Sequence, residues 1–164
     1  MPVHYPLAVG NKWTYKQKDG STYHNSVTGV SGNEYTLHNS AMNTSSRFKL
    51  ENGIYYTDAV EAGNFQPWLK DELNKGDQWE VHFTANGLNS IIVMTVKETG
   101  LTKEVDGKTY NDVAFVEAES KINMNGNIMA LNFFTQYYYA PGVGLVLTTS
   151  SAGDEHALTA YELH

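Results

Sequence analysis

Apolar and polar side chains alternate with a period of two along most of the chain. Within residues 79–84, Trp79, Val81 and Phe83 share one face of an extended segment, and polar residues occupy the other face. This pattern predicts a strand with one buried face. It predicts further strands over 13–18, 22–30, 34–38, 47–50, 54–57, 90–98, 110–119, 128–139, 143–149 and 157–163.

Turn residues separate these segments. Pairs such as Asp19-Gly20, Asn52-Gly53 and Asn86-Gly87 adopt positive φ at little cost and reverse the chain between antiparallel strands. The sequence therefore predicts an all-β fold, either an antiparallel, lipocalin-like β-barrel or a two-sheet sandwich. One segment, 66–74, is predicted to form short helical turns, because Pro67 suits a first helical position.

A Leu-x-x-Gly-x-x-Trp pattern occupies residues 7–13 and recurs at residues 73–79. In both places Gly allows a turn, and Trp begins a strand by filling the core. We interpret the recurrence as a pseudo-twofold internal duplication, with half-repeats at about 1–64 and 69–164 inside a single domain, 1–164. Only three positions are identical, so a chance recurrence of common turn residues is the alternative.

Two segments resemble a known group of proteins. Residues 5–15 (Tyr-Pro-Leu-Ala-Val-Gly-Asn-Lys-Trp-Thr-Tyr) and 138–146 (Tyr-Tyr-Ala-Pro-Gly-Val-Gly-Leu-Val) are similar to the opening and closing strands of uncharacterised exported bacterial proteins and lipoproteins. The resemblance covers the two ends and hardly the middle. It implies a β-rich domain that is periplasmic, outer-membrane-associated or extracellular after removal of a signal peptide. It does not extend to lipid anchoring, because this chain has no cysteine.

Composition narrows the classes of partner. The net charge is -7 and the 11 basic residues are scattered, which argues against nucleic acid and anionic membrane surfaces as partners. No run approaches the roughly 18 apolar residues of a membrane-spanning helix, so direct membrane insertion is not expected. The lack of cysteine excludes disulfides, cysteine-ligated zinc and thiol chemistry.

No local pattern predicts a catalytic, metal or cofactor site. The six histidines never form a His-x-His or His-x-x-x-His pair, and the cluster 154–156 (Asp-Glu-His) follows a turn and is better explained as a polar hairpin tip. Glu117 and Glu119 share one strand face, where they are more typical of an exposed surface than of a glycosidase pair. No Gly-x-Ser-x-Gly motif is present.

Tyrosines carry the remaining functional signal. The runs Tyr55-Tyr56 and 137–139 (Tyr-Tyr-Tyr) must place tyrosines on both faces of their strands. Outward tyrosines together with Trp68 would form a stacking platform for a ligand. Inward tyrosines together with methionines would line an apolar cavity. The third interpretation is that the tyrosines only pack the two faces of a curved sheet. The candidate ligand-binding residues are Tyr55, Tyr56, Trp68, Met94, Met124, Met129, Tyr137, Tyr138 and Tyr139.

These features favour a non-enzymatic envelope or secreted binding module for a small apolar ligand, or for a carbohydrate or protein partner. A structural or assembly domain is the second hypothesis, and a hydrolase of extracellular polymers is the third. The ligand and the oligomeric state are left open.

Overall fold

The computed structural model describes residues 3–164, which form twelve antiparallel strands in one continuous sheet. The predicted all-β class is confirmed. The strands are β1 (Lys12–Gln17), β2 (Thr22–Ser31), β3 (Glu34–Asn39), β4 (Thr44–Glu51), β5 (Ile54–Thr57), β6 (Gln66–Lys70), β7 (Gln78–Ala85), β8 (Leu88–Val105), β9 (Lys108–Met124), β10 (Asn127–Ala140), β11 (Gly144–Ser150) and β12 (Glu155–Glu162). Over residues 3–164, no helix has the length and apolarity needed to cross a membrane.

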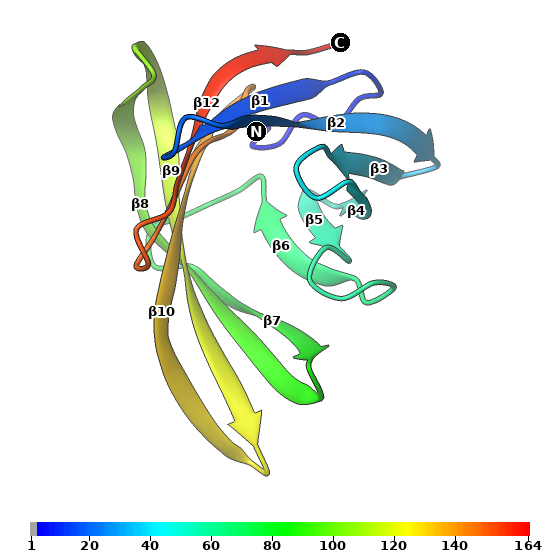
Figure 1. Cartoon of the computed structure of the whole chain (residues 1–164), viewed down its shortest axis with the longest axis vertical. Coiled ribbons are helices and arrows are strands. Elements are labelled where there is room, and N and C mark those ends of the chain that lie inside the picture. Colours follow the sequence, from blue (N-terminus) through cyan, green and yellow to red (C-terminus); the bar gives the residue numbers. More distant parts are fainter. Residues whose placement is uncertain (1–2) are drawn as a thin grey trace.

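The sheet curls into a nearly closed barrel (Figure 1). Its strand order is β6-β5-β4-β3-β2-β1-β12-β11-β10-β9-β8-β7, so almost every strand pairs with its neighbour in sequence. β1 also pairs with β12, and this junction joins the first six strands to the last six. Of the two predicted architectures, the structure is the barrel and not the sandwich. The first and last strands of the sheet, β6 and β7, face each other across the gap in the barrel, which we call the seam.

The predicted helical turns at 66–74 are wrong, because residues 66–70 form strand β6. β6 lies at the edge of the sheet and pairs only with β5, where Pro67 is opposite Tyr56. Proline lacks a donor for a second ladder, and an edge strand does not need one. Pro67, which suggested the start of a helix, is therefore compatible with an edge strand.

Side chains rather than a backbone ladder connect β6 to β7 at the seam. The Gln66 side-chain oxygen accepts a hydrogen bond from His82 N at 3.0 Å, and the Asn64 amide donates to His82 O, also at 3.0 Å. The Glu61 carboxylate accepts a third bond, from Thr84 N at 3.2 Å. Backbone groups of β7 that would be unpaired at an open edge are thus satisfied by side chains.

The two Leu-x-x-Gly-x-x-Trp segments adopt the same local structure. Gly10 N donates to Val27 O at 2.9 Å, and Gly76 N donates to Val96 O at 2.8 Å. The two glycines have φ values of 95° and 94°, which favour glycine, and the tryptophan that ends each segment is buried. The shared turn is consistent with a duplication, which as a relation between whole halves stays a prediction.

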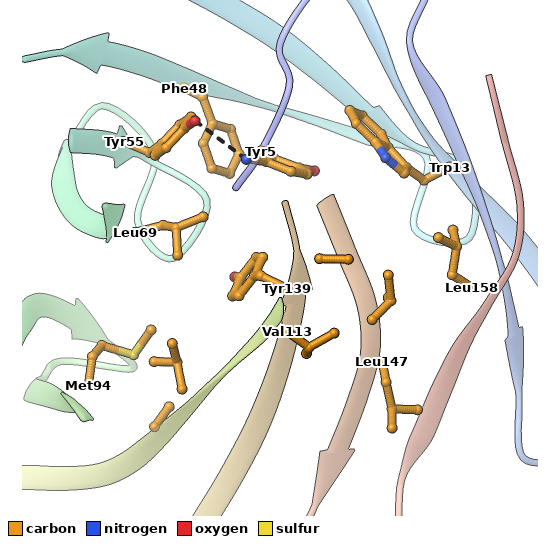
Figure 2. Close-up of a cluster of buried hydrophobic side chains, with 14 of the residues drawn as sticks. Tyr5, Trp13, Phe48, Tyr55, Leu69, Met94, Val113, Tyr139, Leu147 and Leu158 are labelled. Carbon is orange, nitrogen blue, oxygen red and sulfur yellow. Dashed lines mark hydrogen bonds between the residues drawn. The ribbon is translucent and has the colours of Figure 1, made fainter. Parts of the chain in front are cut away.

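The N-terminal segment contributes Tyr5 to the core, where its ring lies among buried side chains of several strands (Figure 2). The Tyr5 ring stacks on Trp13 with centroids 4.9 Å apart, and it meets Phe48 edge-on at 5.6 Å. Trp13 is completely buried, and its Nε1 donates to Val143 O at 2.7 Å. This aromatic cluster ties the start of the chain to the connection between β10 and β11.

The hairpin of β9 and β10 reaches past the rest of the barrel as an arm, which we define as residues 121–134 (Figure 1). At the base of the arm, residues 121–123 still pair with β8. Residues 135–140 of β10 pair with β11, whereas 127–130 pair with β9 alone. The arm carries one charge, on Lys121. Its exposed apolar side chains are Met124, Ile128, Met129, Leu131 and Phe133.

Candidate functional site

A pocket of about 460 Å³ opens from the barrel interior and is the strongest candidate for a functional site. Strands β2 to β4, the loop between β5 and β6, and the ends of β10 and β11 that face them all contribute to it. Its apolar lining consists of Tyr5, Leu37, Met42, Phe48, Ala59, Val60, Ala62, Trp68, Leu69, Tyr137, Tyr139 and Leu145. Its polar lining consists of Asn25, Asn39, Thr44, Ser45, Ser46, Thr57, Asp58 and Glu61.

An aromatic wall is formed by strands from opposite parts of the barrel. The Trp68 ring of β6 meets the Tyr137 ring of β10 edge-on, with centroids 5.7 Å apart and planes inclined by 69°. Tyr139 follows two residues later on the same face of β10, and its ring centroid is 6.4 Å from that of Tyr137. Burial raises the pKa of Tyr137 to about 12, so this wall is uncharged at neutral pH.

Asp58 is held by a fixed set of donors at the edge of the pocket. Arg47 donates to Asp58 Oδ2 through Nε at 3.2 Å and through Nη2 at 3.1 Å. The backbone amides of Arg47 and Gly63 donate to the same carboxylate at 2.8 and 3.2 Å. Burial alone would raise the pKa of Asp58, but these hydrogen bonds and the guanidinium outweigh it and hold the pKa below its ordinary value.

The structure brings three of the nine candidate residues together. Trp68, Tyr137 and Tyr139 line the pocket. Tyr55 and Met94 are fully buried in the core instead. Tyr56 and Tyr138 do not line the pocket. Each is next in sequence to a tyrosine that points inward, so its own side chain lies on the opposite face of the strand.

The two remaining candidates, Met124 and Met129, lie on the arm and are 44% and 49% exposed. Met129 pairs with Ile122, and Ile122 and Met124 share the face of β9 that buries Val116. The methionines thus follow the inward face of the barrel but lie beyond its end. The expected cavity that combines tyrosines with these methionines is not formed, because β10 continues past the end of its neighbour β11, which pairs only with residues 135–140.

Several pocket residues were not among the candidates. Leu37 and Phe48 are inward residues of short alternating strands, and Leu145 belongs to the closing strand of the resemblance. Met42, which is 73% exposed, lies on the turn between β3 and β4. Alternation within each strand indicated which of these side chains point inward, but it gave no sign of which strands face one another.

A second buried polar cluster lies beside the core. The Asp71 carboxylate accepts hydrogen bonds at Oδ1 from the Tyr55 hydroxyl at 2.5 Å and from His4 N at 3.1 Å. Burial and the neighbouring carboxylate raise the pKa of Tyr55, while burial lowers the pKa of His4. The cluster fastens the N-terminal segment to the end of β6, and we interpret it as structural.

Comparison with known proteins gives likenesses of fold. No family model and no curated protein sequence matches this chain. A solved structure from Bacteroides fragilis, named a "putative exported protein with YmcC-like fold", matches with a TM-score of 0.59 at 12% identity, covering 99% of this chain and 100% of that one. A "putative lipoprotein" from Parabacteroides distasonis matches with a TM-score of 0.60 at 13% identity, covering 98% and 99%. At this level of sequence identity, the two matches show that the fold is shared, and they do not show a shared function.

Proposed function

We propose that this chain is an exported, envelope-associated binding protein that holds a small, largely apolar ligand in the barrel pocket. The observation that carries the proposal is the pocket itself: its volume of about 460 Å³ suits a small molecule, and its walls are mainly aromatic and aliphatic. Export is supported by the terminal motifs and by the names of the two proteins that share the fold.

The hydrogen bonds of Asp58 also argue against a catalytic role for this carboxylate. A catalytic carboxylate needs a free oxygen directed at the substrate, whereas Asp58 already accepts hydrogen bonds from Arg47 and Gly63. The neutral amides and hydroxyls of the pocket are suited to orienting a polar group on the ligand. Asn25 and Asn39, for example, bond to each other at 2.9 Å.

We expect Tyr137→Ala to weaken the binding of an apolar fluorescent probe by about tenfold or more, because the variant removes an aromatic wall of the pocket. Tyr138→Ala is the matched control. Its ring faces away from the pocket and stacks on Phe115 at 4.7 Å. Probe titration of both variants, after circular dichroism shows that both are folded, would contradict the proposal if they bound equally well.

The arm supports assembly as a second candidate function. Its apolar side chains are exposed along a part of β10 that has a ladder on one side only, which is the kind of edge that pairs with another strand. We expect Leu131→Lys to reduce concentration-dependent self-association in sedimentation velocity experiments. Val30→Lys, at a residue of β2 that is also 49% exposed, should not reduce it. A wild-type chain that stays monomeric at high concentration would remove this candidate.

A further inference from the structure

The charged lining of the pocket has one sign. Among the described residues, 3–164, the pocket is lined by two carboxylates, Asp58 and Glu61, and by no lysine, arginine or histidine. The whole chain carries a net charge of -7, which adds a negative field at any opening. A ligand with a negative group would therefore enter the pocket without a compensating cation.

The two carboxylates differ in how far they are neutralised. Arg47 forms an ion pair with Asp58 at 3.1 Å, and that carboxylate is almost completely buried. Glu61 has no lysine, arginine or histidine partner within 4.0 Å in the described part of the chain. Glu61 also lines a second hollow of about 370 Å³ at the seam, together with Asn64 and Thr84, so it stands where the two hollows meet. Of the two carboxylates that line the pocket, it is the one whose charge no cation neutralises.

Local hydrogen bonds fix the position of the Glu61 carboxylate. Its Oε1 accepts from Asn64 Nδ2 at 2.8 Å and from Thr84 N at 3.2 Å, so one oxygen is anchored to the seam. Both donors are neutral, and the charge is left without a cation. Glu61 is half-buried, which makes its interaction with a ligand charge stronger than that of a fully exposed carboxylate.

The aromatic rings of the pocket also favour a positively charged ligand. Trp68, Tyr137 and Tyr5 line the pocket, and an aromatic face attracts an ammonium or other organic cation. We propose that the ligand is a cationic amphiphile, with an amine or quaternary ammonium group beside Glu61 and an apolar body against the aromatic wall. This inference rests on the proposed function, because it assigns the ligand class of the same pocket.

The test uses three probes with the same decyl chain and different head groups. Decyltrimethylammonium, decyl glucoside and decanoate are titrated calorimetrically into the full chain, below the concentrations at which they form micelles. We expect the ammonium probe to bind about fivefold more tightly than the glucoside, and decanoate to bind more weakly than both. Tyr137→Ala should weaken the binding of all three.

Glu61→Gln tests the local assignment. The amide keeps an oxygen that can accept from Asn64 and Thr84 but removes the charge, so the preference for ammonium over glucoside should fall to about one. Glu155→Gln removes the same charge from an exposed residue outside the pocket lining, and it should keep the preference.

The outcomes separate the two levels of the proposal. If none of the probes binds, the proposed function fails. If the probes bind in a manner that requires Tyr137 but decanoate binds as tightly as the ammonium probe, the charge inference is overturned and the proposed function is retained. If Glu155→Gln reduces the preference as much as Glu61→Gln does, the field of the whole chain is responsible, and the assignment to Glu61 is overturned.

Discussion

Replacing Trp13 with Ala is expected to lower the free energy of unfolding by about 3–5 kcal/mol, which is typical of removing a large, fully buried aromatic side chain. Trp13 is completely buried, stacks on Tyr5 and donates to Val143 O. The variant would leave a cavity where the N-terminal segment, β1 and the β10–β11 connection meet, and Val143 O would lose its donor. Urea unfolding followed by circular dichroism measures the loss.

Trp79 provides a matched comparison, because it occupies the equivalent place in the second Leu-x-x-Gly-x-x-Trp segment. Its Nε1 is buried without an acceptor among the described residues, whereas Trp13 Nε1 has one. Replacement by Phe should therefore cost more at position 13 than at position 79, by about 1 kcal/mol, the usual contribution of one hydrogen bond. Equal costs would show that the bond to Val143 contributes nothing measurable.

Gly144→Ala is the second substitution with a large expected effect, a loss of about 2–4 kcal/mol from backbone strain and overpacking together. Gly144 has a φ of 120°, and an added Cβ would lie 3.0 Å from Trp13 Nε1 and 3.2 Å from Tyr5 Cδ1. Both neighbours are held in a packed aromatic stack, so they cannot move without disturbing the core. Thermal and urea unfolding of the variant measure the cost.

Gly142→Ala separates strain from crowding. Gly142 also has a positive φ, of 76°, but no atom other than those of the residue and its two chain neighbours lies within 4 Å of the position of an added Cβ. We expect this variant to lose only about 1–2 kcal/mol, from backbone strain alone. If Gly144→Ala were no more destabilising than Gly142→Ala, crowding against Trp13 would not be important.

The periodic features of the fold could be predicted from the sequence. Alternation and Asn-Gly or Asp-Gly turns located eleven strands, because both signals are local and repeat along the chain. Segment 66–70 was misassigned because the signal of Pro67 is ambiguous: proline suits a first helical turn and an edge strand equally. Only the order of strands in the sheet reveals that β6 is an edge.

The candidate site was predictable only in part, for a related reason. The run of tyrosines at 137–139 indicated that alternate rings point inward, and Tyr137 and Tyr139 do line the pocket. The methionines at 124 and 129 follow the same inward parity, but the lengths of neighbouring strands decide whether an inward face is covered. Asn25 and Glu61 reach the pocket through contacts between distant segments, which no local pattern encodes.

The seam between β6 and β7 has a consequence for how a ligand would reach the pocket. If the two halves are duplicates, this seam corresponds to the junction of β12 with β1, which is held by a ladder of six residue pairs. At the seam, the side chains of Glu61, Asn64 and Gln66 provide the connection instead. Separating β6 from β7 would therefore break few hydrogen bonds and would cost less free energy than unfolding the barrel. The circumference of the barrel can then change at one place, so a molecule wider than the resting mouth could enter and leave while the other eleven strand junctions stay intact.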